Sequence, residues 1–205
     1  MNNEIEHIVM SAGSYKGLVY IGILETLIKK NKINLNKIKS IHGCSVGSVV
    51  GLLMNLNIEI DTIKEYIINY PVNSLFKFKA SQIMELYKKM GLYDIDIFYN
   101  VLSGIFKFIG IKKSITLKQL YNLSKKDFFI YSFNINKRKL VQFSHKTHPN
   151  MKVVEAIYMS STIPIIFRPI KYKGDYYLDG TMGDDFPIDY CLKSVNDPKR
   201  SEEHT

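Results

Sequence analysis

The stretch that most constrains this chain runs from residue 37 to residue 55 and reads KIKSIHGCSVGSVVGLLMN. It predicts a short apolar strand, a small-residue turn and an apolar helix. A G-x-S-x-G turn between strand and helix is the setting that exposes a serine as a nucleophile. Gly43 and Gly47 leave room for the neighbouring strand and helix, and the Ser45 hydroxyl lies where unpaired amides favour negative charge. An ordinary βα turn of small residues is the alternative.

A second small-residue loop follows the first expected strand. Residues 4–11 predict that strand, residues 11–17 read SAGSYKG, and residues 18–30 have the apolar spacing of a helix. Amides at such a helix N-terminus bind an anion, either a phosphate or the oxyanion of an acyl transfer. The chain has no G-x-x-x-x-G-K-[ST] and no complete G-x-G-x-x-G, which favours the oxyanion over a nucleotide. Adjacent parallel strands would bring both turns to one sheet edge.

Length and charge limit the class of protein. The 205 residues are 46% hydrophobic and 23% charged, which predicts one folded domain. The net charge of +9 fits either a solvated lysine-rich surface or attraction to an anionic one. The sequence has no nucleic-acid recognition pattern, so we favour lipid headgroups over nucleic acid as the anionic partner. Two cysteines indicate a reducing compartment, and no signal segment or membrane span is apparent. We expect a cytoplasmic protein with peripheral contact to an anionic membrane.

The rest of the chain predicts a helical insertion followed by hairpins. Helices are expected at residues 58–70, 81–90, 95–109, 116–123 and 153–160, and strands at 127–135, 140–144, 170–172 and 176–178. The insertion covers about 58–113, and its segment 95–109 is either a buried helix or an amphipathic lid. Residues 200–205 resemble a translated sequencing adapter. We therefore expect one domain over residues 1–199, truncated at its C-terminus.

A serine needs a base to accept its proton. The five histidines are His7, His42, His145, His148 and His204. A Ser-Asp-His order would require a histidine after Asp179, and only His204, in the suspect tail, follows it. The first two histidines fall on expected strands, where packing roles are common. An alternative is a dyad in which Asp179 itself is the base, although Asp179-Gly180 also reads as a simple turn.

Three stretches together resemble the patatin-like phospholipase family. They are SAGSYKGLVYIGILETL at residues 11–27, GCSVG at residues 43–47, and SSTIPIIFRPIKYKGDYYLDGTMGDDFPI at residues 160–188. The resemblance covers residues 4–190, and the order and spacing of the blocks are more specific than any one of them. It implies a three-layer α/β/α fold with a mainly parallel central sheet. It also implies a lipid acyl hydrolase that needs no metal or other cofactor.

The resemblance assigns roles to individual residues. Ser45 would be the nucleophile that forms an acyl-enzyme, Asp179 the general base, and the amides near Gly13 and Ser14 the oxyanion hole. Supporting positions are Lys16, Gly17, Gly43, Gly47 and Gly180. The chain departs from the family pattern at Ala12, Ser14, Thr181, Asp184 and Asp185. A serine at position 14 restricts φ where the family has glycine, which bears on the placement of the oxyanion hole.

The expected reaction is hydrolysis of a phospholipid or related acyl lipid with release of a fatty acid. Two alternatives stay open at this stage. One is a hydrolase of the same class that acts on a thioester or neutral lipid. The other is a lipid-binding protein that keeps the fold without turnover.

Overall fold

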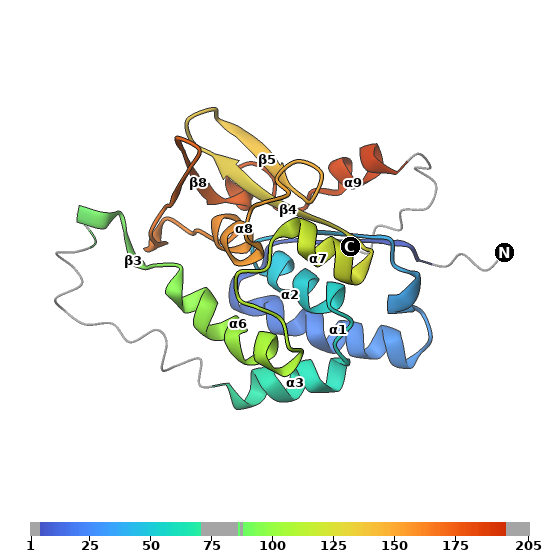
Figure 1. Ribbon diagram of the computed structural model, residues 1–205. Coiled ribbons are helices and arrows are strands. Elements are labelled where there is room, and N and C mark those ends of the chain that lie inside the picture. Colours follow the sequence, from blue (N-terminus) through green and yellow to red (C-terminus); the bar gives the residue numbers. More distant parts are fainter. Residues whose placement is uncertain (1–4, 71–85, 87, 196–205) are drawn as a thin grey trace.

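The protein is described here from a computed structural model, in which residues 5–70, 86 and 88–195 are described (Figure 1). Most of the helix expected at residues 81–90, and the whole of the suspected tail at 200–205, lie outside these residues.

A six-stranded sheet forms the centre of the fold. Its strands are β1 (His7–Met10), β2 (Ser40–Cys44), β4 (Asp127–Asn134), β5 (Lys139–Phe143), β7 (Lys171–Tyr172) and β8 (Asp175–Asp179). The order is β1-β2-β4-β8-β7, and β5 also pairs with β4. β1, β2 and β4 are parallel, whereas β5, β8 and β7 pair antiparallel. The expected mainly parallel sheet is therefore mixed, because short turns connect β4 to β5 and β7 to β8, and tight hairpins force antiparallel pairing.

Helices cover both faces of this sheet. The described helices are α1 (Gly17–Lys29), α2 (Val46–Asn55), α3 (Ile60–Asn69), α6 (Asp96–Phe108), α7 (Leu117–Ser124), α8 (Val153–Ser160) and α9 (Ile188–Ser194). Figure 1 shows α1, α2, α3 and α6 together below the sheet. A Cβ on Gly51 of α2 would touch Phe128 and Ile41, which places α2 on their face of the sheet. Tyr131 faces the other way, by strand alternation, and packs against Tyr190 of α9. The expected three-layer class is confirmed.

The core lies between the sheet and the α2–α8 layer. Fully buried side chains there include Ile41, Leu52, Ile130, Val153 and Ile157. α8 has the predicted bounds, and most other expected elements differ by one to three residues at their ends. Thr116 begins α7 with a capping box, as its sequence position predicts: its hydroxyl accepts from the Gln119 amide while the Gln119 side chain accepts from the Thr116 amide.

Some elements were not expected from the sequence. β3 (Gly91–Tyr93) and β6 (Ile165–Phe167) form a separate two-stranded parallel ribbon. β3 falls inside the segment expected to be a helical insertion, so that segment is not wholly helical. α9 follows the last hairpin and was also missed. Of the described helices, none combines the length and apolar character needed to cross a bilayer.

Candidate active site

The pairing register of β4 brings two distant strand ends together. β2 and β5 both pair with Ile130 and Tyr131, so they lie on opposite edges of β4. β5 and β8 both pair with residues 132–134, so they too lie on opposite edges. β2 and β8 therefore share one edge of β4. Cys44 ends β2 opposite Tyr131 and Asp179 ends β8 opposite Ser132, so the two strands meet end to end.

The residue after Cys44 and the last residue of β8 are in direct contact. The Ser45 hydroxyl donates a hydrogen bond to Oδ2 of Asp179 at 2.7 Å. Both residues are buried. The structure thus brings together the two side chains that the sequence and the family resemblance single out. A hydroxyl held against a carboxylate is the arrangement needed to remove its proton during nucleophilic attack.

The turn that carries Ser45 is sterically tight. Ser45 has φ 51° and ψ −125°, a conformation that few non-glycine residues adopt. A Cβ on Gly43 would lie 2.7 Å from the Gly47 carbonyl oxygen, and a Cβ on Gly47 would lie 2.5 Å from the Met10 carbonyl oxygen. Glycine at both positions is therefore required for α2 to begin so close to β1 and β2. Strained backbone of this kind is common at functional sites.

Asp179 is held at several points. Its Oδ1 accepts a hydrogen bond from the Thr181 amide at 3.0 Å, and its own amide donates to the Thr162 carbonyl at 2.9 Å. Burial raises the pKa of the Asp179 carboxyl, while hydrogen bonds from Ser45 and Thr181 act in the opposite direction. A carboxylate with a raised pKa is a stronger base than one in water.

Gly180 allows Asp179 to approach the elbow. A Cβ at this position would lie 2.6 Å from the Cys44 sulfur and 2.6 Å from the Tyr131 carbonyl oxygen. Any side chain would therefore push the end of β8 away from the end of β2. The supporting role expected for Gly180 has this steric basis.

The loop at residues 11–17 packs against the start of α2. A Cβ on Gly17 would lie 2.1 Å from Val46 Cγ2, so the loop directly abuts the residue that follows Ser45. Ser14 has φ 49°, so it adopts the left-handed conformation that suits glycine. Within the described residues, the amides of Gly13 and Ser14 donate no hydrogen bond. Amides without an acceptor can bind an anion, and the oxyanion role expected for these two stays a prediction.

The other departures from the family pattern also have structural contacts. The Ala12 amide donates to the Asp185 carbonyl at 3.0 Å, which ties this loop to the segment before α9. The Thr181 amide donates to the carboxylate of Asp179, as described above. Lys16 is one of the expected supporting positions and not a departure. It is exposed at the end of the 3-10 turn Ser14–Lys16 that precedes α1.

Ser160 is a site residue whose role the sequence did not reveal. Its hydroxyl accepts a hydrogen bond from the Ser45 amide at 2.9 Å and donates to the Tyr131 carbonyl at 2.5 Å. It therefore fixes the backbone of the elbow relative to β4. The only sequence signal was its place at the start of the S-x-x-x-P segment, which indicates no particular contact.

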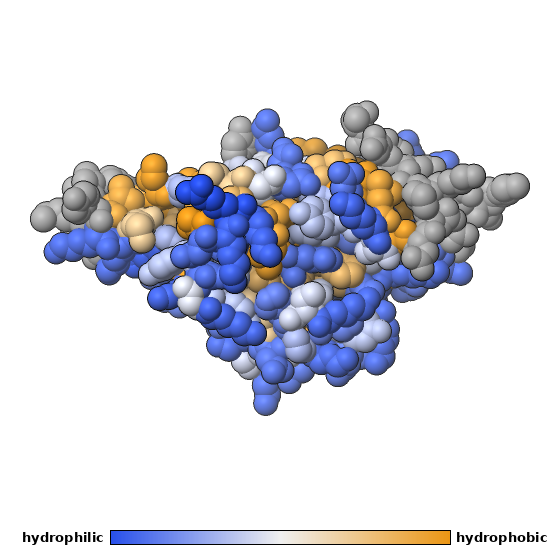
Figure 2. Space-filling view, turned by 90° about the horizontal axis from the view of Figure 1, so that it is seen from above, coloured by the Kyte–Doolittle hydropathy of each residue, from blue (hydrophilic) through white to orange (hydrophobic). Residues whose placement is uncertain are grey.

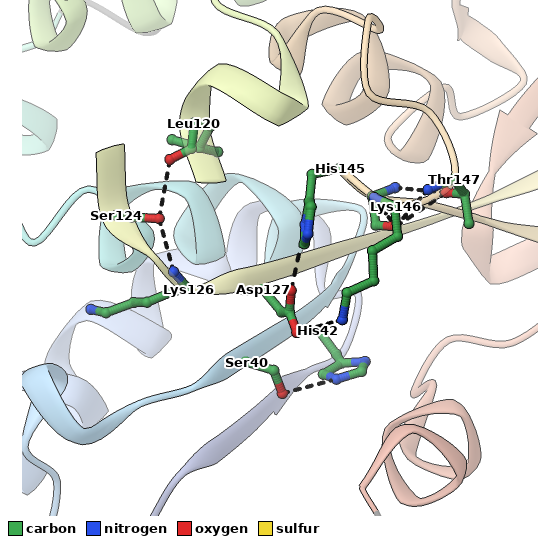
Figure 3. A network of polar contacts seen from close by, with 10 residues as sticks. Ser40, His42, Leu120, Ser124, Lys126, Asp127, His145, Lys146 and Thr147 are labelled. Carbon is green, nitrogen blue, oxygen red and sulfur yellow. Dashed lines mark hydrogen bonds and ion pairs between the residues drawn. The ribbon is translucent and has the colours of Figure 1, made fainter. Parts of the chain in front are cut away.

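The four described histidines have partners elsewhere. His42 is stacked on Phe129 and its Nδ1 lies 2.7 Å from the Tyr131 hydroxyl. Figure 3 shows His42 beside Ser40, and His145 directed at Asp127, at 3.4 Å. His7 contacts Ser40 and His148 contacts Thr147. His42 is buried and stacked, as expected for a strand histidine, and the carboxylate of Asp179 is the group beside Ser45.

Among the described residues, no three His, Cys, Asp or Glu side chains form a group that could hold a metal ion. Cys44 and Cys191 are both buried free thiols. Burial raises the pKa of the Cys44 thiol well above its usual range, which keeps it protonated.

These features define a class: α/β proteins in which a G-x-S-x-G turn between a strand and a helix holds a serine against an aspartate. The family model described as patatin-like phospholipase matches residues 8–192. The chain therefore belongs to the patatin-like phospholipase family, which confirms the resemblance seen in the sequence.

Two viral proteins are similar in sequence. The chain is 30% identical over 191 residues to a protein of Invertebrate iridescent virus 6 named probable lipid hydrolase 463L. It is 28% identical over 186 residues to uncharacterized protein R571 of Acanthamoeba polyphaga mimivirus. The alignments cover 92% and 91% of this chain but 64% and 61% of those proteins. The chain thus spans less than two thirds of the length of either relative.

Two solved structures have a similar fold. VipD from Legionella pneumophila superposes with a TM-score of 0.66 at 18% identity, covering 90% of this chain and 47% of VipD. ExoU from Pseudomonas aeruginosa, solved with SpcU, has a TM-score of 0.53 at 18% identity and covers 78% of this chain and 38% of that one.

Proposed function

We propose that the protein is a lipid acyl hydrolase that works through a Ser45–Asp179 dyad. The observation that carries the proposal is the 2.7 Å hydrogen bond from the Ser45 hydroxyl to Asp179. Membership of the patatin-like phospholipase family and similarity to a probable lipid hydrolase support an acyl lipid as the substrate.

In the first half-reaction, the Ser45 oxygen attacks the ester carbonyl carbon while Asp179 Oδ2 takes the hydroxyl proton. The amides of Gly13 and Ser14 donate hydrogen bonds to the oxyanion of the tetrahedral intermediate. Asp179 then returns the proton to the departing alcohol oxygen as the carbon–oxygen bond breaks. The product is an acyl group esterified to Ser45.

In the second half-reaction, a water molecule gives a proton to Asp179 and attacks the acyl-enzyme carbonyl. The intermediate collapses, Ser45 recovers its proton, and a free fatty acid leaves. Every step uses one serine, one carboxylate and main-chain amides, so the mechanism needs no other ionisable side chain.

The test is release of fatty acid from vesicles of mixed phospholipids. The unaltered protein should release fatty acid, and Ser45→Ala should release none while keeping its melting temperature within a few degrees. Ser114→Ala, at an exposed loop serine, is the matched control and should remain active. Hydrolysis retained by Ser45→Ala would contradict the mechanism.

A substrate panel separates the remaining alternatives. A hydrolase of thioesters or neutral lipids would release product from those substrates in preference to phospholipids. A lipid-binding protein without turnover would bind the vesicles and release nothing from any of them.

A further inference from the structure

The β3–β6 ribbon exposes large apolar side chains. Ile165 is 64% exposed, Met90 is 60% exposed and Ile166 is 38% exposed. Gly91, which follows Met90, pairs with Ile165 across the ribbon. These three residues therefore form one exposed apolar edge, which we call the ribbon edge.

The backbone of Ile165 is strained. Ile165 has φ 74°, which is rare for a β-branched residue. Glycine or asparagine would adopt this conformation more easily. Strand alternation is interrupted here, because Ile165 and Ile166 are both exposed, whereas Phe167 is buried. The chain thus retains an exposed isoleucine at a position where a smaller or polar residue would be less strained.

The ribbon edge is physically tied to the dyad. The Thr162 carbonyl accepts the hydrogen bond from the Asp179 amide, and Ile165 follows Thr162 by three residues. The Cα atoms of Thr162 and Ile165 are therefore within about 11 Å of each other. The opposite strand is anchored too, because Arg168 donates hydrogen bonds from its guanidinium to the carbonyls of Gly91 and Leu92.

Cationic side chains flank the same edge. Lys88 and Lys89 are exposed and directly precede Met90. Asp94, the acidic residue at the end of this strand, is paired with Arg168 at 3.1 Å. Figure 2 shows apolar surface at the left end of the molecule, the end at which Figure 1 places β3, as well as over the middle and right of this face. An apolar edge with adjacent lysines is complementary to a bilayer that contains anionic lipids.

We propose that the ribbon edge docks the protein on anionic phospholipid membranes, with Ile165, Ile166 and Met90 entering the interface and Lys88 contacting the headgroups. This inference rests on the proposed function, since it supplies the lipid to the Ser45–Asp179 site. Docking here brings the membrane to the part of the molecule that holds Asp179 in position.

The test measures binding without turnover, using Ser45→Ala protein and vesicles of phosphatidylcholine with or without phosphatidylserine. Adding Ile165→Asn should lower the partition coefficient about tenfold, as expected from the loss of one inserted side chain. Asparagine suits the positive φ, so the melting temperature should not fall. Adding Lys88→Gln instead should weaken binding about fivefold, and only to vesicles that contain phosphatidylserine.

The matched control is Ile68→Asn, at a 71% exposed isoleucine on α3, which should bind as well as its parent. Unchanged binding by the Ile165→Asn protein, or an equal loss in Ile68→Asn, would overturn the proposal. A concentration-dependent rise in mass without vesicles, abolished by Ile165→Asn, would show that a second copy covers the edge and would also overturn it. Because no hydrolysis is measured, failure of the proposed reaction leaves this test intact.

Discussion

The Ser45 hydroxyl donates a hydrogen bond to Asp179 Oδ2 at 2.7 Å, although the two residues are 134 positions apart in sequence. The contact follows from the register of β4, which places the end of β2 opposite Tyr131 and the end of β8 opposite Ser132. A parallel strand and an antiparallel strand thus approach each other along one edge of β4. The mixed sheet is therefore what brings this serine and this carboxylate together.

Asp179→Asn should abolish hydrolysis without unfolding the protein. An asparagine can accept the Thr181 amide bond through its oxygen and donate from its NH2 to the Ser45 oxygen, but it cannot take the serine proton, so kcat should fall by about 10²–10⁴-fold. Burial raises the pKa of this carboxyl, which means that the fold disfavours its charged form. The melting temperature at pH 7 should therefore be unchanged or higher. Thermal unfolding and fatty acid release measure the two effects, and a large fall in melting temperature would contradict this account of Asp179.

Gly47→Ala should strongly destabilise the protein. Its Cβ would lie 2.5 Å from the Met10 carbonyl oxygen, and backbone atoms cannot move aside as a flexible side chain can. We expect a loss of at least about 3 kcal/mol in the free energy of unfolding, or roughly 6–12 °C in melting temperature. Gly22→Ala is the control, because a Cβ there meets nothing within 4 Å, and it should stabilise α1 by up to about 1 kcal/mol. Similar melting temperatures for the two variants would argue against the steric account of the elbow.

Ser160→Ala should lower kcat through the position of Ser45. The substitution leaves the buried Ser45 amide without its acceptor, which costs about 1–3 kcal/mol of stability and loosens the elbow. We expect kcat to fall about tenfold with little change in KM, as for a residue that positions another. Ser144→Ala removes an equally buried hydroxyl from the loop after β5 and should lower stability without lowering kcat. An equal kcat for Ser160→Ala and the unaltered protein would rule out the positioning role.

His42→Gln should reduce the acid sensitivity of the fold. Burial lowers the pKa of His42 to about 3 from 6.5, with a smaller contribution from nearby His7. Between those values the unfolded chain binds a proton that the folded protein does not, so stability falls as pH decreases through this window. Removing the imidazole should make that slope shallower by up to about 1.4 kcal/mol per pH unit. Urea unfolding from pH 7 to pH 4 measures the free energy of unfolding at each pH. Identical slopes of that free energy against pH for His42→Gln and the unaltered protein would contradict the prediction.

Local patterns predicted much of the fold. The apolar spacing of residues 153–160 and the turn residues at 136–138 determine their own conformation, so α8 and the β4–β5 hairpin were predictable. The elbow was also predictable, because Gly43 and Gly47 flank a serine between a strand and a helix. The partnership of Ser45 with Asp179 was not derivable from local pattern, since it depends on pairing register. The absence of a suitable histidine left it as one alternative, and the family resemblance favoured it.

Other features lacked any local signal. β3 and β6 are three-residue strands that pair over 74 positions, from Gly91 to Ile165, and such short segments show no alternation long enough to read. The positive φ of Ile165 runs against the preference of its side chain and arises from the surrounding structure. The role of Ser160 depends on where the α8 end meets the elbow. Tertiary packing, and not sequence periodicity, determines these three features.

The most direct test of the dyad is labelling with a fluorophosphonate probe, followed by mass spectrometry to find the modified residue. Activation of Ser45 by Asp179 predicts one adduct on Ser45, absent in Ser45→Ala and at least a hundredfold slower to form in Asp179→Asn, as expected when a general base is removed. An adduct on a different serine, or labelling of Ser45 at an unchanged rate in Asp179→Asn, would contradict the account.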